Sequence, residues 1–383
     1  MRFGTINHIS WVIKMLEPLV YAVSPIIADA LTSAVKAYLE KAGSAPDKIR
    51  SEEEEHIVTP VFGSYVTRNA GFAKELQSLN AIVKAYVDRP DVGRPLNILL
   101  AAEPGSGKSF LIKQLAESIA PKEERDKFPF LEFHVAAFSS SDDLYGILHR
   151  VQSLNLQGKL PFILFDEVDG KVAGQHILAK FLAPMWDGKF HLARETFTLG
   201  KAVFAFAASA MVPAPSLHTV LGEDIEKLQV SITYEDFKMQ WENLVAKSIR
   251  SGNDNSPDRI EKKKDFLDRI DRIVCIPPVH KILSGEAAAK EQVDIAFLLT
   301  TKHFKKVRRI EKAVLHVLIS EKLVKNTSRR VAEKCIFCSQ LKDPIIFRYQ
   351  DLPGDDQSRY SESADVKQQL GQFLSFELKK AQP

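Results

Sequence analysis

Apolar residues fall into two kinds of pattern along the chain, which predict buried strands and amphipathic helices. Short apolar or alternating runs predict strands at residues 96–100, 131–135, 162–165, 202–207 and 272–276. Apolar residues at helical spacing predict helices at 72–87, 111–119 and 144–151. A further helical stretch within 176–190 leads into a predicted hairpin at 190–199. The pattern therefore predicts a buried sheet whose strands are joined by helices.

Changes in this pattern predict the domain organisation. Residues 43–56 are polar, with a run of four glutamates, and are interpreted as an exposed linker. A long insertion at 211–264 contains a helix with Phe237 and Trp241 on its apolar face. From 279 the pattern is helical throughout, and the chain ends in a polar tail. The predicted segments are an N-terminal helical segment with its linker, an α/β domain, a helical domain and a tail, at residues 1–50, 51–278, 279–341 and 342–383.

The N-terminal segment has apolar residues at helical spacing between Leu16 and Ala34, which predicts one or two amphipathic helices. Its longest uncharged run, Pro18–Ala28, is far shorter than the ~20 residues that span a bilayer. No signal peptide is predicted, since no cleavage site follows a basic start and a short apolar core. We expect these helices to pack on the protein or on a neighbouring subunit. A helix on a membrane surface is the alternative, which the few lysines do not favour.

The sequence AAEPGSGKS follows the strand at 96–100 and opens a helix. Such a loop curls its backbone amides around a phosphate, and the helix N-terminus adds free N–H groups and a partial positive charge. Lys108 is placed to reach the β- and γ-phosphate oxygens, and Ser109 to face Mg²⁺. Ala102 stands where the usual pattern has its first glycine, which a negative φ tolerates. The predicted nucleotide-binding residues of this loop are Glu103, Pro104, Gly105, Ser106, Gly107, Lys108, Ser109 and Phe110.

Two adjacent carboxylates, Asp166 and Glu167, end the strand at 162–165. Neighbouring residues at a strand end point in different directions, so the two can have different roles. Asp166 can hold the shell of a Mg²⁺ ion through water, while Glu167 polarises a water molecule that attacks the γ-phosphate. Either motif alone could be an ordinary turn, but each predicts the other. Together they predict ATP and Mg²⁺ as cofactors and ATP hydrolysis as the reaction.

Composition says little about the partners or the cellular compartment of the protein. The 383 residues carry a formal net charge of +3, which gives no argument for a nucleic-acid or membrane partner. The three cysteines suit a reducing compartment better than a disulfide framework. A cytoplasmic protein is therefore expected.

The order of these motifs resembles that of the AAA+ ATPases over residues 60–341. The resemblance implies a P-loop NTPase fold of the α/β class, an αβα sandwich with a five-stranded parallel sheet and a small helical lid. It also implies a homo-oligomer, a ring or arc and most often a hexamer, with nucleotide lying between core and lid and against a neighbouring subunit. Residues 182–209 are similar to the clade with a hairpin before sensor 1, which includes Clp-type unfoldases, Lon-type proteases and bacterial enhancer-binding activators. The protease, DNA-reading and zinc-binding domains of those groups are not recognisable in the sequence.

Three further site residues are implied by the resemblance alone. Ser209 matches the sensor-1 position, where the family prefers Asn or Thr to orient the lytic water. Arg269, in DFLDRIDRIVCIPPV, takes the position of the arginine finger that reaches the γ-phosphate of a neighbouring subunit. The alternative is that Arg269 and Arg272 only pair with the aspartates beside them. Arg329, in NTSRRVAEK, matches the start of the sensor-2 helix, or is a surface charge.

The biological role stays open between two main hypotheses. The first is an oligomeric, ATP-driven remodeller that pulls on a protein or nucleic-acid partner. Tyr145 and Gly146 lie where many AAA+ rings have an aromatic-glycine loop that grips a polymer. The favoured alternative is that Tyr145 simply belongs to the first turn of a capped helix. The second is a nucleotide-controlled switch or scaffold, which the insertion and the N-terminal helices favour. The intact Lys108, Asp166 and Glu167 disfavour a third hypothesis, an inactive structural protein.

Overall fold

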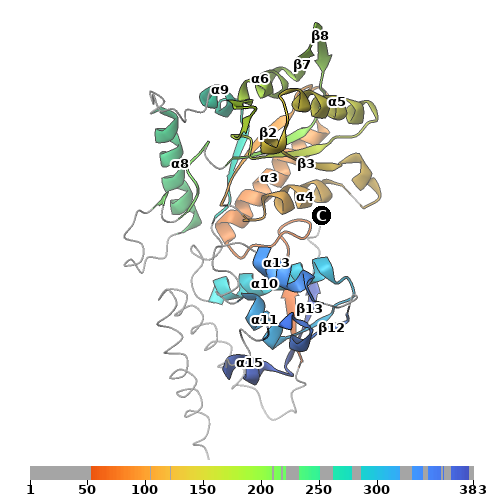
Figure 1. The fold of residues 1–383 in the computed structure, drawn as a ribbon, viewed down its shortest axis with the longest axis vertical. Coiled ribbons are helices and arrows are strands. Elements are labelled where there is room, and N and C mark those ends of the chain that lie inside the picture. Colours follow the sequence, from red (N-terminus) through yellow and green to blue (C-terminus); the bar gives the residue numbers. More distant parts are fainter. Residues whose placement is uncertain are drawn as a thin grey trace, which may run out of the picture.

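The computed structural model describes most of the chain after residue 52, as two bodies. The described residues are 53–103, 105–120, 122–208, 211–216, 219–220, 233–250, 262–277, 286–319, 330–339, 344–354, 357 and 364–378. The larger body holds a five-stranded sheet, and the smaller body lies below it in Figure 1. The predicted N-terminal helices lie outside the described residues.

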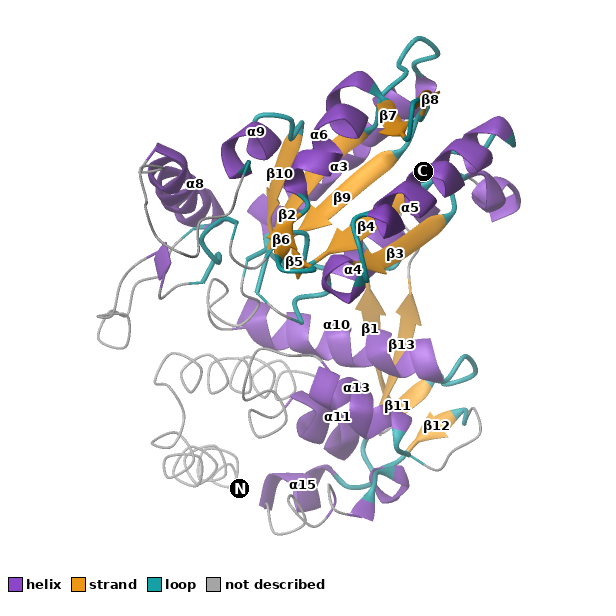
Figure 2. Cartoon of the chain, turned by 45° about the horizontal axis from the view of Figure 1, so that its top comes forward, coloured by secondary structure: helices purple, strands orange, loops and turns teal. Residues whose placement is uncertain are grey.

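Five parallel strands form the central sheet, in the order β10-β2-β9-β4-β3 (Figure 2). They are β2 (Leu96–Ala101), β3 (Phe130–His134), β4 (Phe162–Asp166), β9 (Val203–Ala207) and β10 (Arg272–Cys275). Strands β2, β4 and β9 are almost wholly buried because layers cover both faces of the sheet. The predicted α/β fold with a five-stranded parallel sheet is confirmed.

Helices cover the two faces of this sheet. Those that follow the predicted helical periods are α3 (Ala70–Asp88), α4 (Lys108–Ile119), α5 (Asp142–Leu156) and α6 (Leu178–Asp187). Helices α3 and α4 share one apolar core with one face of the strands, while α5, α6 and α9 (Lys263–Leu267) share another core with the opposite face. Within the described ranges, no helix combines the length and the apolarity needed to cross a bilayer.

Phenylalanine rings link the second core to the short helix before β10. The ring of Phe165 stacks on that of Phe206 with centroids 5.5 Å apart. Phe206 in turn meets Phe266 of α9 edge to face at 4.9 Å. All three side chains are fully buried, so α9 is anchored directly on the sheet.

The predicted hairpin and the predicted insertion helix are both present in the larger body. The hairpin is β7 (Lys189–Leu192) paired with β8 (Glu195–Thr198), between α6 and β9. The helix is α8 (Tyr234–Arg250), and it buries Phe237 and Trp241 as predicted. The short elements are β5 (Lys171–Val172), β6 (Gln175–His176) and the 3-10 helices η1 (Lys122–Lys127) and η2 (Val135–Ala137).

The smaller body contains a sheet that the sequence did not predict. Its strands lie in the order β1-β13-β11-β12, which are Glu53–Val58, Phe373–Leu378, Arg309–Glu311 and Ile346–Phe347. The accompanying helices are α10 (Glu286–His303), α11 (Lys312–Ile319), α13 (Arg330–Phe337), η4 (Tyr349–Asp351) and α15 (Ala364–Gln369). Figure 2 shows β1 and β13 side by side, so both ends of the described chain meet in one sheet.

Two interpretations of the sequence are therefore wrong in this body. Residues 43–56 are not a linker throughout, because Glu53–His56 belong to β1 and pair in parallel with β13. The region from 279 to 341 is not helical throughout, because β11 interrupts it. A glutamate run has no strand signal of its own, and pairing with a distant strand decides its structure. The domain boundaries drawn from the sequence stay predictions.

An ion pair joins the two bodies. Arg68, in the loop between β1 and α3, donates through Nε to Oδ2 of Asp294 at 2.7 Å and through Nη2 to Oδ1 at 3.1 Å. Asp294 belongs to α10 and has no exposed surface. The pair therefore fixes α10 beside the loop that leads into α3.

Gly188, which ends α6, should not tolerate alanine. Its φ is 62°, and an added Cβ would collide with the carbonyl oxygen of Gly93 and lie 3.0 Å from Cα of Arg94. Both the left-handed backbone and the collision oppose a side chain. Gly188→Ala should therefore lower the free energy of unfolding by about 2 kcal/mol or more, measured by denaturant titration.

Gly146 provides the matched control for this substitution. It lies inside α5, and a Cβ added there meets nothing within 4 Å. Gly146→Ala should leave stability unchanged or raise it by up to ~1 kcal/mol, because alanine favours the helix. Equal effects at the two positions would contradict the account of Gly188.

Candidate functional site

The loop after β2 has the geometry that its sequence predicts. Strand β2 ends at Ala101, and α4 begins at Lys108. Gly105 and Gly107 have φ values of 77° and 91°, in the region that favours glycine. Ala102 is not among the described residues with positive φ, so a methyl group is tolerated where the usual pattern has glycine.

This loop presents polar groups that suit a phosphate. Gly107 caps α4 without a side-chain hydrogen bond, so it leaves the first amides of the helix open to a ligand. The Oγ atom of Ser106 is buried and has no hydrogen-bond partner among the described residues. A phosphate accepts hydrogen bonds from helix amides and from a hydroxyl, which would satisfy both groups. Pro104 lies outside the described residues.

Phe110 contacts an aromatic wall that the sequence analysis missed. Its ring stacks on Tyr65 with centroids 6.0 Å apart, and Tyr65 stacks on Phe62 at 5.8 Å. The N–H of Ser64 donates to Oε1 of Gln114 at 2.5 Å, which ties this segment to α4. The loop between β1 and α3 therefore forms an apolar wall beside the phosphate loop.

The two carboxylates that end β4 lie in different surroundings. Asp166 is half-buried, whereas Glu167 is exposed. Glu167 has a left-handed backbone with φ 55°, which is uncommon for a residue with a side chain. Hydrogen bonds hold this turn: the Val168 N–H donates to Ala207 O at 3.1 Å, and the Gly170 N–H to Glu167 O at 2.9 Å. Strain of this kind is characteristic of functional sites.

Strand β3 brings two further polar side chains to this edge of the sheet. The hydroxyl of Ser109 donates to Oε1 of Glu132 at 2.6 Å. His134 pairs in register with Asp166, and its Nδ1 lies 3.6 Å from Oδ2 of that residue. Glu132 precedes His134 by two residues and so shares its face of the strand. The alternation of polar and apolar residues at 131–135 was the signal that could have found them.

The oxygen atoms of Ser109 and Asp166 fit a Mg²⁺ ion that arrives with a nucleotide. Both are hard ligands of the kind that Mg²⁺ prefers. Across the described ranges, no group of three or more His, Cys, Asp and Glu side chains could hold a metal. Magnesium typically takes only one or two carboxylates from a protein, with water and phosphate oxygens completing its shell. Ser109 and Asp166 therefore suit an ion whose remaining ligands are water and phosphate oxygens.

Arg269 precedes the amino end of β10, whereas the phosphate loop follows the carboxyl end of β2. Strand β10 is parallel to β2, with Arg272 paired to Ile98 and Cys275 to Ala101. Because a strand rises about 3.3 Å per residue, Arg272 lies about 10 Å before the level at which the phosphate loop begins. Arg269 precedes Arg272 by a turn of the chain, so it starts still farther from that loop.

The guanidinium of Arg269 is held by its own turn. Its Nη1 donates to the backbone oxygen of Asp265 at 2.5 Å, and its buried Nε has no hydrogen-bond partner in the part of the chain that the structure describes. Asp271 pairs with Arg94 instead, and Arg272 donates to Ser78 at 3.5 Å. Among the described contacts, the alternative pairing of Arg269 and Arg272 with adjacent aspartates is therefore not present.

Residues 98–211 match the model of the ATPase family associated with various cellular activities (AAA). This segment is an AAA domain. It runs from β2 through the phosphate loop and Asp166 to just beyond β9, so the predicted resemblance is confirmed there. The match does not reach Arg269 or the smaller body.

A similar solved structure is that of NtrX from Brucella abortus in complex with ATP, with 12% identity and a TM-score of 0.42. The match covers 89% of this chain and 66% of the NtrX chain. No curated protein matches the sequence.

Within the AAA domain, Tyr145 lies in the first turn of α5, as the alternative interpretation predicted. Its half-buried ring stacks on Phe190 of the hairpin at 6.5 Å, and Nζ of Lys180 lies 5.9 Å from its centroid. Like Pro104, the predicted site residues Ser209 and Arg329 lie outside the described residues.

Proposed function

We propose that the chain binds ATP with Mg²⁺ and hydrolyses it to ADP and phosphate in its AAA domain. The observation that supports this most is the placement of the phosphate loop and of Asp166 and Glu167 at one edge of the sheet. Strand β9 lies between β2 and β4, so the two motifs are two strands apart. At about 4.8 Å per strand, that separation is about 10 Å, which a triphosphate and its ion can bridge.

Each residue has a distinct part in this proposal. Lys108 neutralises charge on the β- and γ-phosphates, and Glu167 orients the attacking water. Ser109 and Asp166 would hold Mg²⁺, which would offset the negative charge that develops on the phosphate oxygens. The Ser109 hydroxyl can offer a lone pair to the ion while it keeps donating its proton to Glu132, which orients it and makes it a better ligand.

We further propose that Arg269 acts on the nucleotide of a neighbouring copy of the chain. In its own subunit Arg269 lies before the amino end of β10, whereas Lys108 follows the carboxyl end of the neighbouring strand β2. A role at the γ-phosphate therefore needs a second subunit, which supports a homo-oligomer with composite sites. A ring or arc of six subunits stays the expectation from the family resemblance.

Two biological roles remain proposals. An oligomeric remodeller needs a side chain that grips its partner, and Tyr145, the best candidate, is packed on the hairpin. This packing supports the second role, a nucleotide-controlled switch or scaffold. Stimulation of ATP turnover by unfolded protein or by DNA, lost in Tyr145→Ala, would favour the remodeller over the switch.

Glu167→Gln should retain ATP that it cannot hydrolyse. The amide keeps the shape of the side chain but cannot accept the proton of the attacking water, so turnover should fall by about 100-fold or more. Affinity for ATP should stay near that of the wild type. Calorimetry with ATP and Mg²⁺, combined with phosphate release, measures both quantities.

The exposed carboxylate of Glu195, in the hairpin, offers a matched control. Glu195→Gln removes one negative charge from the same domain and should leave turnover unchanged. Normal turnover in Glu167→Gln would mean that another residue prepares the water, and this part of the proposal would be wrong.

A further inference from the structure

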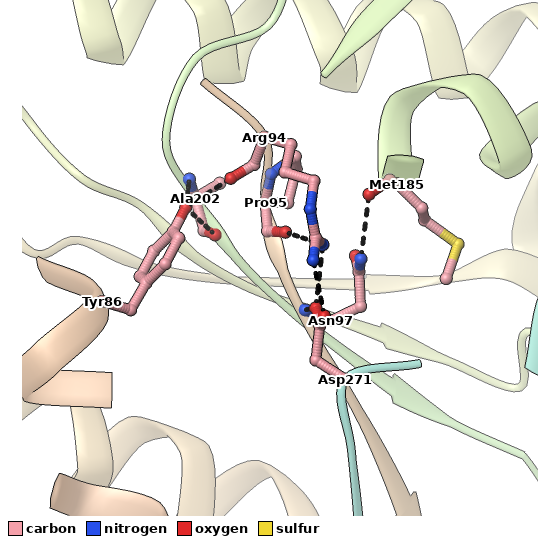
Figure 3. A network of polar contacts seen from close by, with 7 residues as sticks. All are labelled: Tyr86, Arg94, Pro95, Asn97, Met185, Ala202 and Asp271. Carbon is pink, nitrogen blue, oxygen red and sulfur yellow. Dashed lines mark hydrogen bonds and ion pairs between the residues drawn. The ribbon is translucent and has the colours of Figure 1, made fainter. Parts of the chain in front are cut away.

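A network of polar contacts joins the amino ends of β2 and β10, whereas the phosphate loop lies at the carboxyl end of β2 (Figure 3). Arg94 donates to Asp271 through two hydrogen bonds, Nη1 to Oδ2 at 3.0 Å and Nη2 to Oδ1 at 2.7 Å. Oδ2 of Asp271 also accepts the N–H of Asn97 at 2.8 Å, and the Asp271 N–H donates to Asn97 O at 2.9 Å. Both the backbone and the side chain of Asp271 are thus fixed to β2.

The other partner of the pair, Arg94, is itself held in place. Its carbonyl oxygen accepts the hydroxyl of Tyr86 at 2.8 Å, and the same hydroxyl accepts the N–H of Ala202 at 3.0 Å. Burial raises the pKa of Tyr86, so this hydroxyl stays protonated and can donate. The guanidinium also lies over the ring of Trp186, 5.5 Å from its centroid. These contacts fix both the backbone and the guanidinium of Arg94.

Asp271 lies two residues after Arg269, in the turn between α9 and β10. This turn is closed by hydrogen bonds from the Arg269 N–H to Phe266 O and from the Ile270 N–H to Leu267 O, both 3.1 Å. One end of the turn is anchored by the buried ring of Phe266. The pair between Asp271 and Arg94 anchors the other end. The position of the Arg269 backbone relative to β2 therefore depends on this pair.

This arrangement suits positioning better than stabilisation. The side chains of Arg94 and Asp271 are 33% and 24% exposed, and ion pairs in contact with water add little to folding stability. A bidentate pair between a guanidinium and a carboxylate does, however, fix relative orientation. Its main effect is therefore on where the turn sits.

We propose that Arg94, through Asp271, positions Arg269 for its action on the nucleotide of a neighbouring subunit. The inference rests on the proposed role of Arg269 as a finger. Arg94 touches no nucleotide in this account and is a positioning residue. Its loss should thus damage the site that the chain completes on its neighbour and spare the site that holds its own nucleotide.

Mixed oligomers of the full-length chain test this directly. Arg94→Ala should bind an ATP analogue within about twofold of the wild type, and its turnover should fall about tenfold to hundredfold, as expected when a reacting group is misplaced by about 1 Å. Mixing it with Lys108→Ala should restore turnover, because the second chain supplies an intact finger to the intact phosphate loop of the first. Arg269→Ala mixed with Lys108→Ala should behave in the same way.

Three variants sharpen the comparison. Arg94→Lys keeps the charge but cannot form the two-bonded fork, so its turnover should be intermediate. Asp271→Asn keeps an oxygen for the Asn97 N–H and should lose turnover as Arg94→Ala does; it carries the test if Arg94→Ala does not fold. Lys127→Ala removes an exposed ion pair with Glu124 elsewhere in the domain, 3.2 Å long, and should keep wild-type turnover.

The outcomes separate this inference from the proposed function. Wild-type turnover in Arg94→Ala, or loss of ATP-analogue binding, would overturn the positioning role. So would a mixture with Lys108→Ala that stays inactive while the Arg269→Ala mixture recovers. Wild-type turnover in Arg269→Ala would show that the finger itself is wrong, and the role of Arg94 would fall with it.

Discussion

Lys108→Ala should abolish nucleotide binding. Lys108 is the first residue of α4, at the end of the phosphate loop. Its ammonium group would compensate charge on the β- and γ-phosphates. Hydrogen bonds to charged groups contribute about 1.5–3 kcal/mol each, so losing two of them should weaken affinity by about 100-fold or more. Calorimetric titration with a non-hydrolysable ATP analogue measures this loss.

Lys113 offers the matched control, one turn farther along the same helix and exposed. Lys113→Ala removes the same charge at a greater distance from the loop and should leave affinity nearly unchanged. If both variants bind the analogue as the wild type does, the assignment of the phosphate loop is wrong.

Arg269→Ala should bind ATP almost normally and hydrolyse it very slowly. Arginine fingers contribute about 10³ to 10⁵ in rate in phosphoryl transfer, whereas an arginine that only bonds the backbone of its own turn should leave turnover nearly unchanged. The two explanations of Arg269 therefore predict very different turnover. Single-turnover hydrolysis, measured at a protein concentration where the chain assembles, distinguishes them.

Arg272 provides the control for this variant, since it is exposed and only three residues away. Arg272→Ala should keep turnover within a few-fold of the wild type. A mixture of Arg269→Ala with Lys108→Ala should recover activity, because interfaces of one orientation pair an intact finger with an intact loop. If the two chains co-assemble and remain inactive, the finger does not act between subunits.

The sequence was sufficient for the central sheet and the phosphate loop because the physics there is local. Strands buried on both faces are mostly apolar: β9 is a continuous apolar run, and β2 and β4 each contain a single polar residue, Asn97 and the terminal Asp166. The loop needs left-handed backbone at Gly105 and Gly107, and glycine marks such positions. Element type and order could therefore be predicted before any tertiary contact was known.

The sheet of the smaller body could not be predicted, because its strands have no signal of their own. Strand β1 begins with glutamates, and β12 is only two residues long. The pairing of Glu53 with Phe373 joins positions 320 residues apart, so only the folded chain brings them together. Tertiary pairing decides such strands, and local propensity does not.

Only the part of the candidate site that has a local sequence pattern could be predicted. The residues that carry a spacing pattern, Lys108 to Ser109 and Asp166 to Glu167, meet at one edge of the sheet. Glu132 and Tyr65 reach the same region from β3 and from the loop before α3, through contacts that depend on strand register and loop packing. The alternation at 131–135 marks Glu132 as a polar position of a strand, but it does not show which side chain Glu132 contacts.

The rate of phosphate release per chain, measured with ATP and Mg²⁺ over a range of protein concentrations, tests the central claim most directly. A composite site with Lys108 on one subunit and Arg269 on another predicts a rate per chain that is low in dilute protein and rises to a plateau as the chains assemble. A rate that is independent of protein concentration, or no release by a chain that binds ATP, would contradict the account.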